Sequence, residues 1–119
     1  MTKFVKNLFV NIMNTLLKNA REQKNLKTRE LAQLMGIDQA LISKFENGSR
    51  KPTKEQVKKL SEILEINYET LIIEWIKARI LYEIKDEEFG IKALQLAEAE
   101  AIYNAAFKRK PLSKNLQAI

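Results

Sequence analysis

Residues 26–48 read LKTRELAQLMGIDQALISKFENG, and this stretch decides the fold. Its apolar residues recur every three or four positions, the spacing of two short amphipathic helices separated by Gly36. Glycine takes the left-handed backbone conformation that ends a helix at the lowest cost. Thr28 and Asp38 stand just before the two apolar runs, where a short polar side chain caps a helix. The stretch therefore predicts two helices joined by a tight turn.

Helical periodicity continues on both sides of this stretch. Asn25 suits a left-handed stop after a first helix, and Thr53 suits the cap of a fourth. Only 3 Gly and 2 Pro occur in 119 residues, too few for the turns of a strand-rich fold. The sequence therefore predicts an all-α chain. Six helices are expected. The first ends near residue 23, the next four cover 29–35, 39–47, 54–64 and 67–84, and the last begins at Asp86 or Glu87 and ends near 108.

The composition excludes most catalytic chemistry. The chain has no Cys and no His, which removes disulfides, thiolate and imidazole metal ligands, and the usual nucleophile and general base. The carboxylates at Glu83 and residues 86–88 lack the spaced oxygen ligands and the glycine of a calcium loop. Charge at a helix N-terminus explains them better. Glu30 and Glu46 are expected to pair with nearby Arg or Lys side chains rather than to perform acid–base chemistry. No catalytic residue, metal or cofactor is expected.

Basic charge is concentrated in the first half of the chain. Residues 1–60 hold 13 Lys and Arg against 5 Asp and Glu, whereas residues 61–119 hold 8 against 10, and the whole chain has a net charge of +6. This asymmetry indicates that one end meets a polyanion such as nucleic acid, with a solvated basic surface as the alternative. Neither a membrane span nor a secretion signal is recognisable, so a cytoplasmic location is expected.

Residues 26–48 resemble the XRE/Cro-like helix-turn-helix family of phage repressors and bacterial regulators. The shared features are the Glu-Leu-Ala triplet, the glycine of the turn, the Ile-Ser-Lys-Phe-Glu-Asn-Gly ending and the proline that follows at position 52. The resemblance covers roughly residues 16–72, about half of the chain. It implies a five-helix lambda-repressor-like DNA-binding domain, which a C-terminal helical extension follows here.

The resemblance also implies which side chains contact DNA. Glutamine can pair with an adenine edge, lysine reaches guanine acceptors, alanine admits a thymine methyl group, and serine donates to a base or a phosphate. The implied base-contacting set is Gln39, Ala40, Ser43 and Lys44. The implied backbone-contacting set is Thr28, Arg29, Asn47, Ser49, Arg50 and Lys51. Thr28 can also serve as a simple helix cap, and a solvated loop is the alternative for Arg50 and Lys51.

The C-terminal third has more apolar surface than a minimal five-helix domain can cover. The helix from 67 to 84 is apolar on more than one face, and the helix after it adds a second apolar stripe. The last helix can fold back over the domain, form a two-fold interface together with its neighbour, or do both, and we favour the combination. Trp75 suits a core or dimer contact better than ligand stacking. The expected dimer interface comprises Leu71, Trp75, Ile76 and Ile80.

These observations lead to a sequence-specific, dimeric DNA-binding regulator as the first hypothesis, with double-stranded DNA as its partner. An antitoxin-like module that neutralises a toxin or enzyme partner is the alternative, and an enzyme is the third hypothesis. Residues 1–12 can extend the first helix, form a swapped arm or precede a natural start at Met13. The expected segments are an extension at 1–12, a DNA-binding domain at 13–72, a dimerising helical extension at 73–110 and a flexible tail at 111–119.

Overall fold

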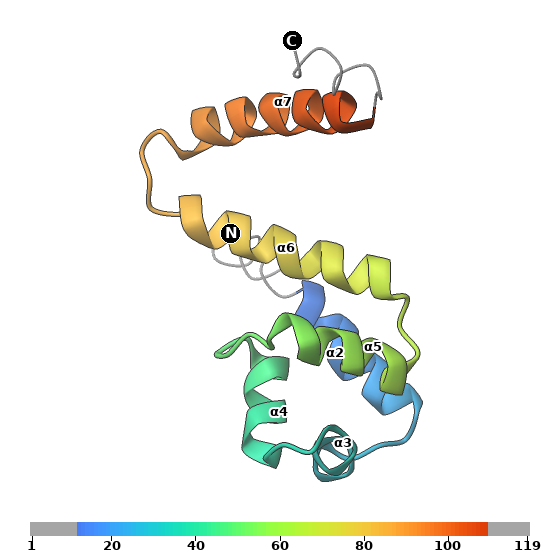
Figure 1. The fold of residues 1–119 in the computed structure, drawn as a ribbon. Helices are drawn as coiled ribbons and strands as arrows, with labels where there is room; N and C mark the ends of the chain where they lie inside the picture. The colour runs from blue at the N-terminus through green and yellow to red at the C-terminus, as the bar shows by residue number, and fades with distance from the viewer. Residues whose placement is uncertain (1–11, 110–119) are drawn as a thin grey trace. The chain divides into compact units, whose positions relative to one another are not determined.

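The computed structural model describes residues 12–109. Within this range the chain forms six helices and no strand, so the all-α prediction is confirmed. Figure 1 labels them α2 (Ile12–Gln23), α3 (Thr28–Met35), α4 (Gln39–Asn47), α5 (Lys54–Leu64), α6 (Tyr68–Ile84) and α7 (Gly90–Arg109). The predicted tail at 111–119, and all of the extension at 1–12 except Ile12, lie outside the described residues.

Each helix from α2 to α5 is followed by a residue with left-handed backbone geometry. The φ angles are 57° at Asn25, 71° at Gly36, 84° at Gly48 and 55° at Glu65. At Gly36 the turn closes when the Ile37 N–H donates to the Ala32 carbonyl at 3.0 Å. This is the chain reversal that the glycine predicts, and it brings α4 against α3 after only three connecting residues.

Glu65 is the unexpected member, because a side chain costs energy in the left-handed region. The Ile66 N–H donates to the Ser61 carbonyl at 3.0 Å, and the Ile66 side chain packs against the core. Bringing Ile66 inward therefore requires the left-handed residue before it. The Glu65 carboxylate accepts a hydrogen bond from the Lys24 ammonium, and this contact lowers the pKa of Glu65. Since the pair is solvent-exposed, its contribution to stability is small.

Three predicted helix starts are wrong: α6 begins at Tyr68 and not at residue 67, and the other two are those of α3 and α7. Helix α3 begins at Thr28, and Lys27 rather than Thr28 is its N-cap residue. There the Leu31 N–H donates to the Lys27 carbonyl at 3.0 Å, and the Glu30 carboxylate accepts from the Lys27 N–H at 2.7 Å. Glu30, expected to pair with a basic side chain, binds a backbone amide instead. By contrast, Asp38 and Thr53 stand at the predicted N-cap positions of α4 and α5.

The third wrong start is that of α7, which begins at Gly90 and not at Asp86 or Glu87. The chain turns before it: the Glu87 N–H donates to the Ile84 carbonyl, and the Gly90 N–H donates to the Glu87 carbonyl, both at 3.1 Å. Gly90 is buried in this turn, and a Cβ atom there would lie 2.8 Å from the Ile84 carbonyl oxygen. Because the Gly90 backbone lies so close to Ile84, the chain forms a turn at residues 84–90, and α7 begins only at Gly90.

One apolar cluster holds α2 to α6 together. Its buried members are Met13, Leu17, Leu31, Ala32, Met35, Ile42, Phe45, Val57, Leu60, Leu64, Leu71 and Trp75. Helix α2 contacts α4 and α5, and α3 contacts α4 and α5. A fully buried leucine or phenylalanine contributes about 1.5–3 kcal/mol, so the cluster fixes the helix pair that the turn brings together.

The first half of α6 belongs to this core. The Thr70 N–H donates to Asn67 Oδ1 at 2.9 Å and caps the helix, and Leu71 and Trp75 then enter the cluster. The Trp75 indole N–H donates to the carbonyl of Pro52, in the loop between α4 and α5, at 2.8 Å. Helix α6 is therefore joined to the domain by apolar contact and by one directional bond.

The chain divides into two compact units, and the division falls between Arg79 and Ile80. The sequence places the domain boundary earlier, after residue 72. In the second unit most of the large apolar side chains are exposed, and Ile84, Leu94 and Phe107 are half-buried. Among the exposed ones are Leu81, Tyr82, Phe89, Ile91, Leu96, Ile102 and Tyr103. None of the helices within residues 12–109 is both long and apolar enough to cross a bilayer.

Candidate nucleic-acid interface

Helix α4 has a polar side directly opposite its buried side. Ile42 and Phe45 point into the core. At 100° per residue, positions 39, 40, 43, 44 and 47 fall together on the other side of the helix. All five of these side chains are exposed: Gln39, Ala40, Ser43, Lys44 and Asn47. The structure therefore gathers the four predicted base-contacting residues on one accessible stripe.

A hydrogen bond joins this stripe to the start of α3. The Gln39 amide Nε2 donates to Thr28 Oγ1 at 3.0 Å. The bond uses one of the two N–H groups of the amide, so the second N–H and the carbonyl oxygen remain for the paired contact that an adenine edge offers. Thr28 is half-buried and Arg29, beside it, is exposed. The first turn of α3 thus stands next to the first turn of α4.

The loop after α4 folds back onto the end of that helix. The Ser49 N–H donates to Asn47 Oδ1 at 2.8 Å, and the Arg50 N–H donates to the Lys44 carbonyl at 3.3 Å. The side chains of Ser49, Arg50 and Lys51 are exposed. The Oδ1 acceptor of Asn47 is used within the turn, and its Nδ2 donors remain for a phosphate, whose oxygens accept hydrogen bonds.

An ion pair fixes the far end of α4 to α2. Arg21 Nε and Nη2 donate to the two carboxylate oxygens of Glu46 at 2.6 and 3.1 Å, and Arg21 Nη1 donates to the Leu26 carbonyl at 2.7 Å. The hydrogen bonds to Glu46 raise the pKa of Arg21 above its ordinary value. The predicted pairing of Glu46 with a basic side chain is confirmed. One guanidinium therefore ties together α2, the loop before α3, and α4.

Comparison with known proteins agrees with this geometry. A family model described as Helix-turn-helix matches residues 17–71. The HTH-type transcriptional repressor RghR of Bacillus subtilis (strain 168) is 39% identical over 97 residues, which cover 76% of this chain and 68% of the relative. The chain belongs to the XRE/Cro-like helix-turn-helix family of transcriptional regulators.

Another relative supports the same membership over a shorter stretch. The uncharacterized HTH-type transcriptional regulator RghRB of the same organism is 40% identical over 57 residues, 47% of this chain and 41% of the relative. No solved structure matches the chain significantly. In this helix-turn-helix regulator, α2 to α6 form the predicted five-helix lambda-repressor-like domain, and the predicted C-terminal helical extension follows it.

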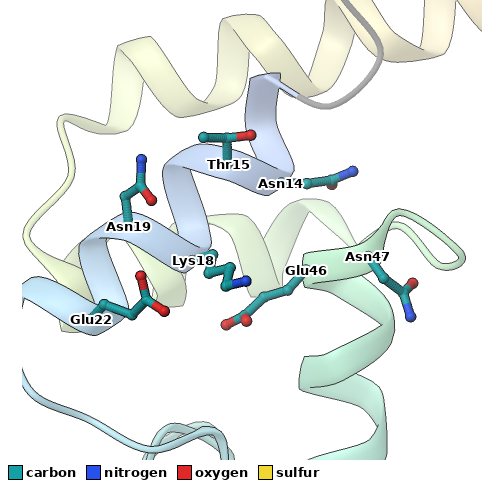
Figure 2. Close-up of a pocket in the computed structure, with 7 residues that line it drawn as sticks. All are labelled: Asn14, Thr15, Lys18, Asn19, Glu22, Glu46 and Asn47. Atoms are coloured by element: carbon teal, nitrogen blue, oxygen red, sulfur yellow. The ribbon is translucent and has the colours of Figure 1, made fainter. Parts of the chain in front are cut away.

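A polar groove of about 440 Å³ lies between α2 and the end of α4. Figure 2 shows the side chains that line it: Asn14, Thr15, Lys18, Asn19, Glu22, Glu46 and Asn47. Asn47 alone among these belongs to the predicted DNA-contacting sets, and Glu46 is held by Arg21. The groove therefore lies beside the contact stripe of the helix-turn-helix domain and does not contain it.

The residues predicted for the dimer interface separate into two pairs. Leu71 and Trp75 are 0% and 9% exposed and belong to the core of the domain. Ile76 and Ile80 are 45% and 42% exposed, and Ile73, which is not among the residues predicted from the sequence, is 52% exposed. Positions 73, 76 and 80 follow the helical spacing of one face. The apolar face of α6 that is free for a partner in the regulator therefore comprises Ile73, Ile76 and Ile80.

Proposed function

We propose that this regulator binds specific duplex DNA as a two-fold dimer, with α4 in the major groove of each half of a pseudo-palindromic operator. The observation that carries the proposal is the exposed stripe of α4, opposite Ile42 and Phe45 and linked to Thr28 through Gln39. A helix that reads a groove needs one buried side to hold it and one side of short polar and basic groups to meet base edges.

The proposed base contacts come from Gln39, Ala40, Ser43 and Lys44. Gln39 pairs with an adenine edge, and Lys44 donates to guanine acceptors. Ala40 leaves room for a thymine methyl group, and Ser43, one helical turn after Gln39, donates to a base or phosphate. These roles follow from side-chain chemistry and from the accessibility of all four residues.

The proposed backbone contacts lie on both flanks of that stripe. Thr28 and Arg29 lie in the first turn of α3, where the positive end of the helix dipole favours a phosphate. Asn47, Ser49, Arg50 and Lys51 form the other flank, and they are exposed on the loop that folds against α4. Contacts of this kind fix register and supply salt-dependent affinity without reading sequence.

The proposed dimer uses the exposed face of α6, namely Ile73, Ile76 and Ile80, together with the apolar side chains of the C-terminal unit. An apolar surface of this extent marks an interaction site. Two recognition helices on one side of the duplex reach half-sites about 34 Å apart only when a two-fold axis relates them. The proposed DNA-binding domain covers residues 13–72 and the proposed dimerising extension covers 73–110; α6 crosses this boundary, and its Trp75 packs in the core of the DNA-binding domain.

We further propose that the regulator represses transcription in the cytoplasm without enzymatic activity or a cofactor. The support is its family membership and a relative whose name is that of a transcriptional repressor. The antitoxin-like alternative gains no support from either comparison.

Selection from a random pool of duplexes tests this function and identifies the operator sequence in the same experiment. We expect the full-length protein to enrich sequences with inverted half-sites one helical turn apart, and to bind them at least a thousandfold more tightly than scrambled duplexes. Equal affinity for selected and scrambled duplexes would contradict sequence-specific binding. Enrichment of a single half-site without symmetry would contradict the dimeric arrangement.

A further inference from the structure

Trp75 is a single aromatic group that links α6 to the loop beside the proposed DNA contacts. It is the one tryptophan in the chain. Its ring is buried in the core, and its Nε1–H donates to the Pro52 carbonyl at 2.8 Å. Arg79, one turn further along α6, lies over the ring with its Cζ atom 4.9 Å from the centroid. The indole therefore has a fixed position and a fixed direction of donation.

The loop that Trp75 reaches is held at three points. At its start, Gly48 is left-handed and the Arg50 N–H donates to the Lys44 carbonyl. At its end, Thr53 and Gln56 exchange hydrogen bonds at 2.8 and 3.1 Å, which fixes the cap of α5. Between these points, Pro52 is buried, and its carbonyl is held by the indole.

We propose that Trp75 is a positioning residue for DNA-backbone contact, acting through Pro52 on Ser49, Arg50 and Lys51. This inference rests on the proposed function, because it requires those loop residues to meet phosphates. Pro52 is the residue directly after Lys51, so the bond to its carbonyl anchors the C-terminal end of the loop segment that carries Arg50 and Lys51. A loop held in its bound path loses less conformational freedom on binding, which strengthens every contact it makes.

Trp75→Phe should have an effect on DNA binding that loss of core packing would not produce. Trp75→Phe keeps an aromatic ring in the core and a face for Arg79, but it removes the donor to Pro52. We expect DNA affinity to fall about three- to tenfold, similarly for selected and scrambled duplexes, together with a shallower salt dependence. Trp75→Phe should therefore leave the preference for the selected sequence unchanged.

A double-mutant cycle with Arg50→Ala separates positioning from general destabilisation. Arg50→Ala alone should weaken binding to all duplexes and reduce the salt slope by about one. If Trp75 acts by placing Arg50, Trp75→Phe should have a much smaller effect in the Arg50→Ala background than in the wild type. Val57→Ala is the matched control, because it removes buried atoms of the same core on α5 and should combine additively with Arg50→Ala.

The fluorescence of Trp75 provides a second readout that needs no substitution in the core. Titration of the wild-type protein with duplex DNA should change the emission of this one tryptophan, and the change should diminish in the double variant Arg50→Ala/Lys51→Ala compared at saturating DNA. If Arg50→Ala weakens DNA binding and the losses from Trp75→Phe and Arg50→Ala simply add, the positioning role is overturned and the proposed function stays intact. Unchanged DNA affinity in Arg50→Ala and Lys51→Ala would overturn the backbone contacts, and the positioning role with them.

Discussion

Gln39 is the base-contact candidate whose orientation is most directly constrained, because its amide donates to Thr28 Oγ1. A side chain held in this way meets a base without first losing rotamer freedom. Lys44, one turn further along α4, has no such short link to α3 and relies on the helix alone for its direction. Gln39 is therefore expected to contact its base in a fixed orientation, whereas the Lys44 side chain can adjust to its base.

Replacement of either residue tests this assignment. Gln39→Ala and Lys44→Ala should each cost about 1–3 kcal/mol of binding free energy on the selected duplex, because each removes a contact to a base edge. Their affinity for scrambled duplexes should change much less. Fluorescence anisotropy titrations on both duplexes at one salt concentration measure the difference.

Gln95→Ala is the matched control for this pair, since Gln95 is an exposed glutamine on α7, outside the helix-turn-helix domain. It should leave both affinities unchanged. Wild-type affinity of both Gln39→Ala and Lys44→Ala for the selected duplex would show that α4 does not read the bases.

Among the secondary-structure elements, α4 depends on a contact far away in sequence for its orientation. The Arg21 and Glu46 side chains are about one-tenth exposed, and the guanidinium also holds the Leu26 carbonyl. Because the pair is only partly buried, its net gain over an apolar pair of the same shape is small, but loss of one member leaves the other charge without its partner where water reaches it poorly.

Arg21→Met should therefore destabilise the domain by about 1–3 kcal/mol, the cost of leaving a partly buried hydrogen-bonding group without its partner. The double variant Arg21→Met/Glu46→Leu should be clearly more stable than Arg21→Met, because no unpaired carboxylate remains. Urea denaturation followed by circular dichroism gives both values. A double variant as unstable as the sum of the losses in Arg21→Met and Glu46→Leu would show no coupling between the two side chains and would contradict this account.

At Gly90, in the turn between α6 and α7, steric contact and helix propensity predict opposite effects of a change to alanine. Propensity favours alanine over glycine in a helix by up to about 1 kcal/mol. At Gly90, however, a Cβ atom would lie 2.8 Å from a backbone oxygen and 2.9 Å from the Ile84 Cβ, so the turn has to shift. Gly90→Ala should therefore reduce the hydrogen-exchange protection of the α7 amides.

Gly36→Ala is the informative comparison. No atom lies within 4 Å of a Cβ at Gly36, but its φ of 71° costs an alanine about 1–2 kcal/mol. Its effect should appear in the helix-turn-helix domain and not in α7. Greater protection of α7 in Gly90→Ala than in the wild type would mean that the turn is not closed as described.

Local sequence signals predicted most of these elements, but they did not identify the long-range contacts or the close approaches of backbone that shift a helix start. The stops at Asn25 and Gly36 and the helices Gln39–Asn47 and Lys54–Leu64 follow from residues that lie within a few positions of each boundary. The Arg21–Glu46 pair spans 25 residues and the Trp75–Pro52 bond 23, and no local pattern identifies either partner. The late start of α7 arises from the approach of Gly90 to Ile84, which periodicity does not record.

At the scale of the whole molecule, α6 serves two purposes. Its first turns complete the domain core through Leu71 and Trp75, and Ile73, Ile76 and Ile80 form an exposed apolar face. A chain shortened to end at Asn67 would lose both core residues, so it would test folding rather than association. Substitutions on the exposed face are the cleaner test of the dimer.

The double variant Ile76→Asp/Ile80→Asp should be monomeric at micromolar concentration, and we expect the wild type to sediment as a dimer. Placing two carboxylates in an apolar interface leaves charges without partners there. Affinity for the symmetric duplex should fall strongly, and affinity for a single half-site should not. Analytical ultracentrifugation and anisotropy titrations measure the two effects.

Leu34→Asp is the control, because Leu34 is 53% exposed on α3 and lies outside the proposed interface. It should leave the wild-type dimer intact. A wild-type protein that sediments as a monomer at micromolar concentration, both alone and on its selected duplex, would contradict the proposed dimer.

The Asn47–Gly48 step at the end of α4 has a consequence for the chemical ageing of the protein. Glycine has no side chain to hinder attack of its backbone nitrogen on the preceding amide carbon, so Asn–Gly is the dipeptide most prone to deamidation. Conversion of Asn47 in this way releases ammonia and forms a cyclic imide, which water opens to isoaspartate or aspartate; the aspartate form keeps the backbone and the oxygen that accepts from Ser49. Conversion also removes the Nδ2 donors and adds a negative charge between Lys44 and Arg50. Aged protein in the aspartate form should therefore stay folded while it loses affinity for DNA.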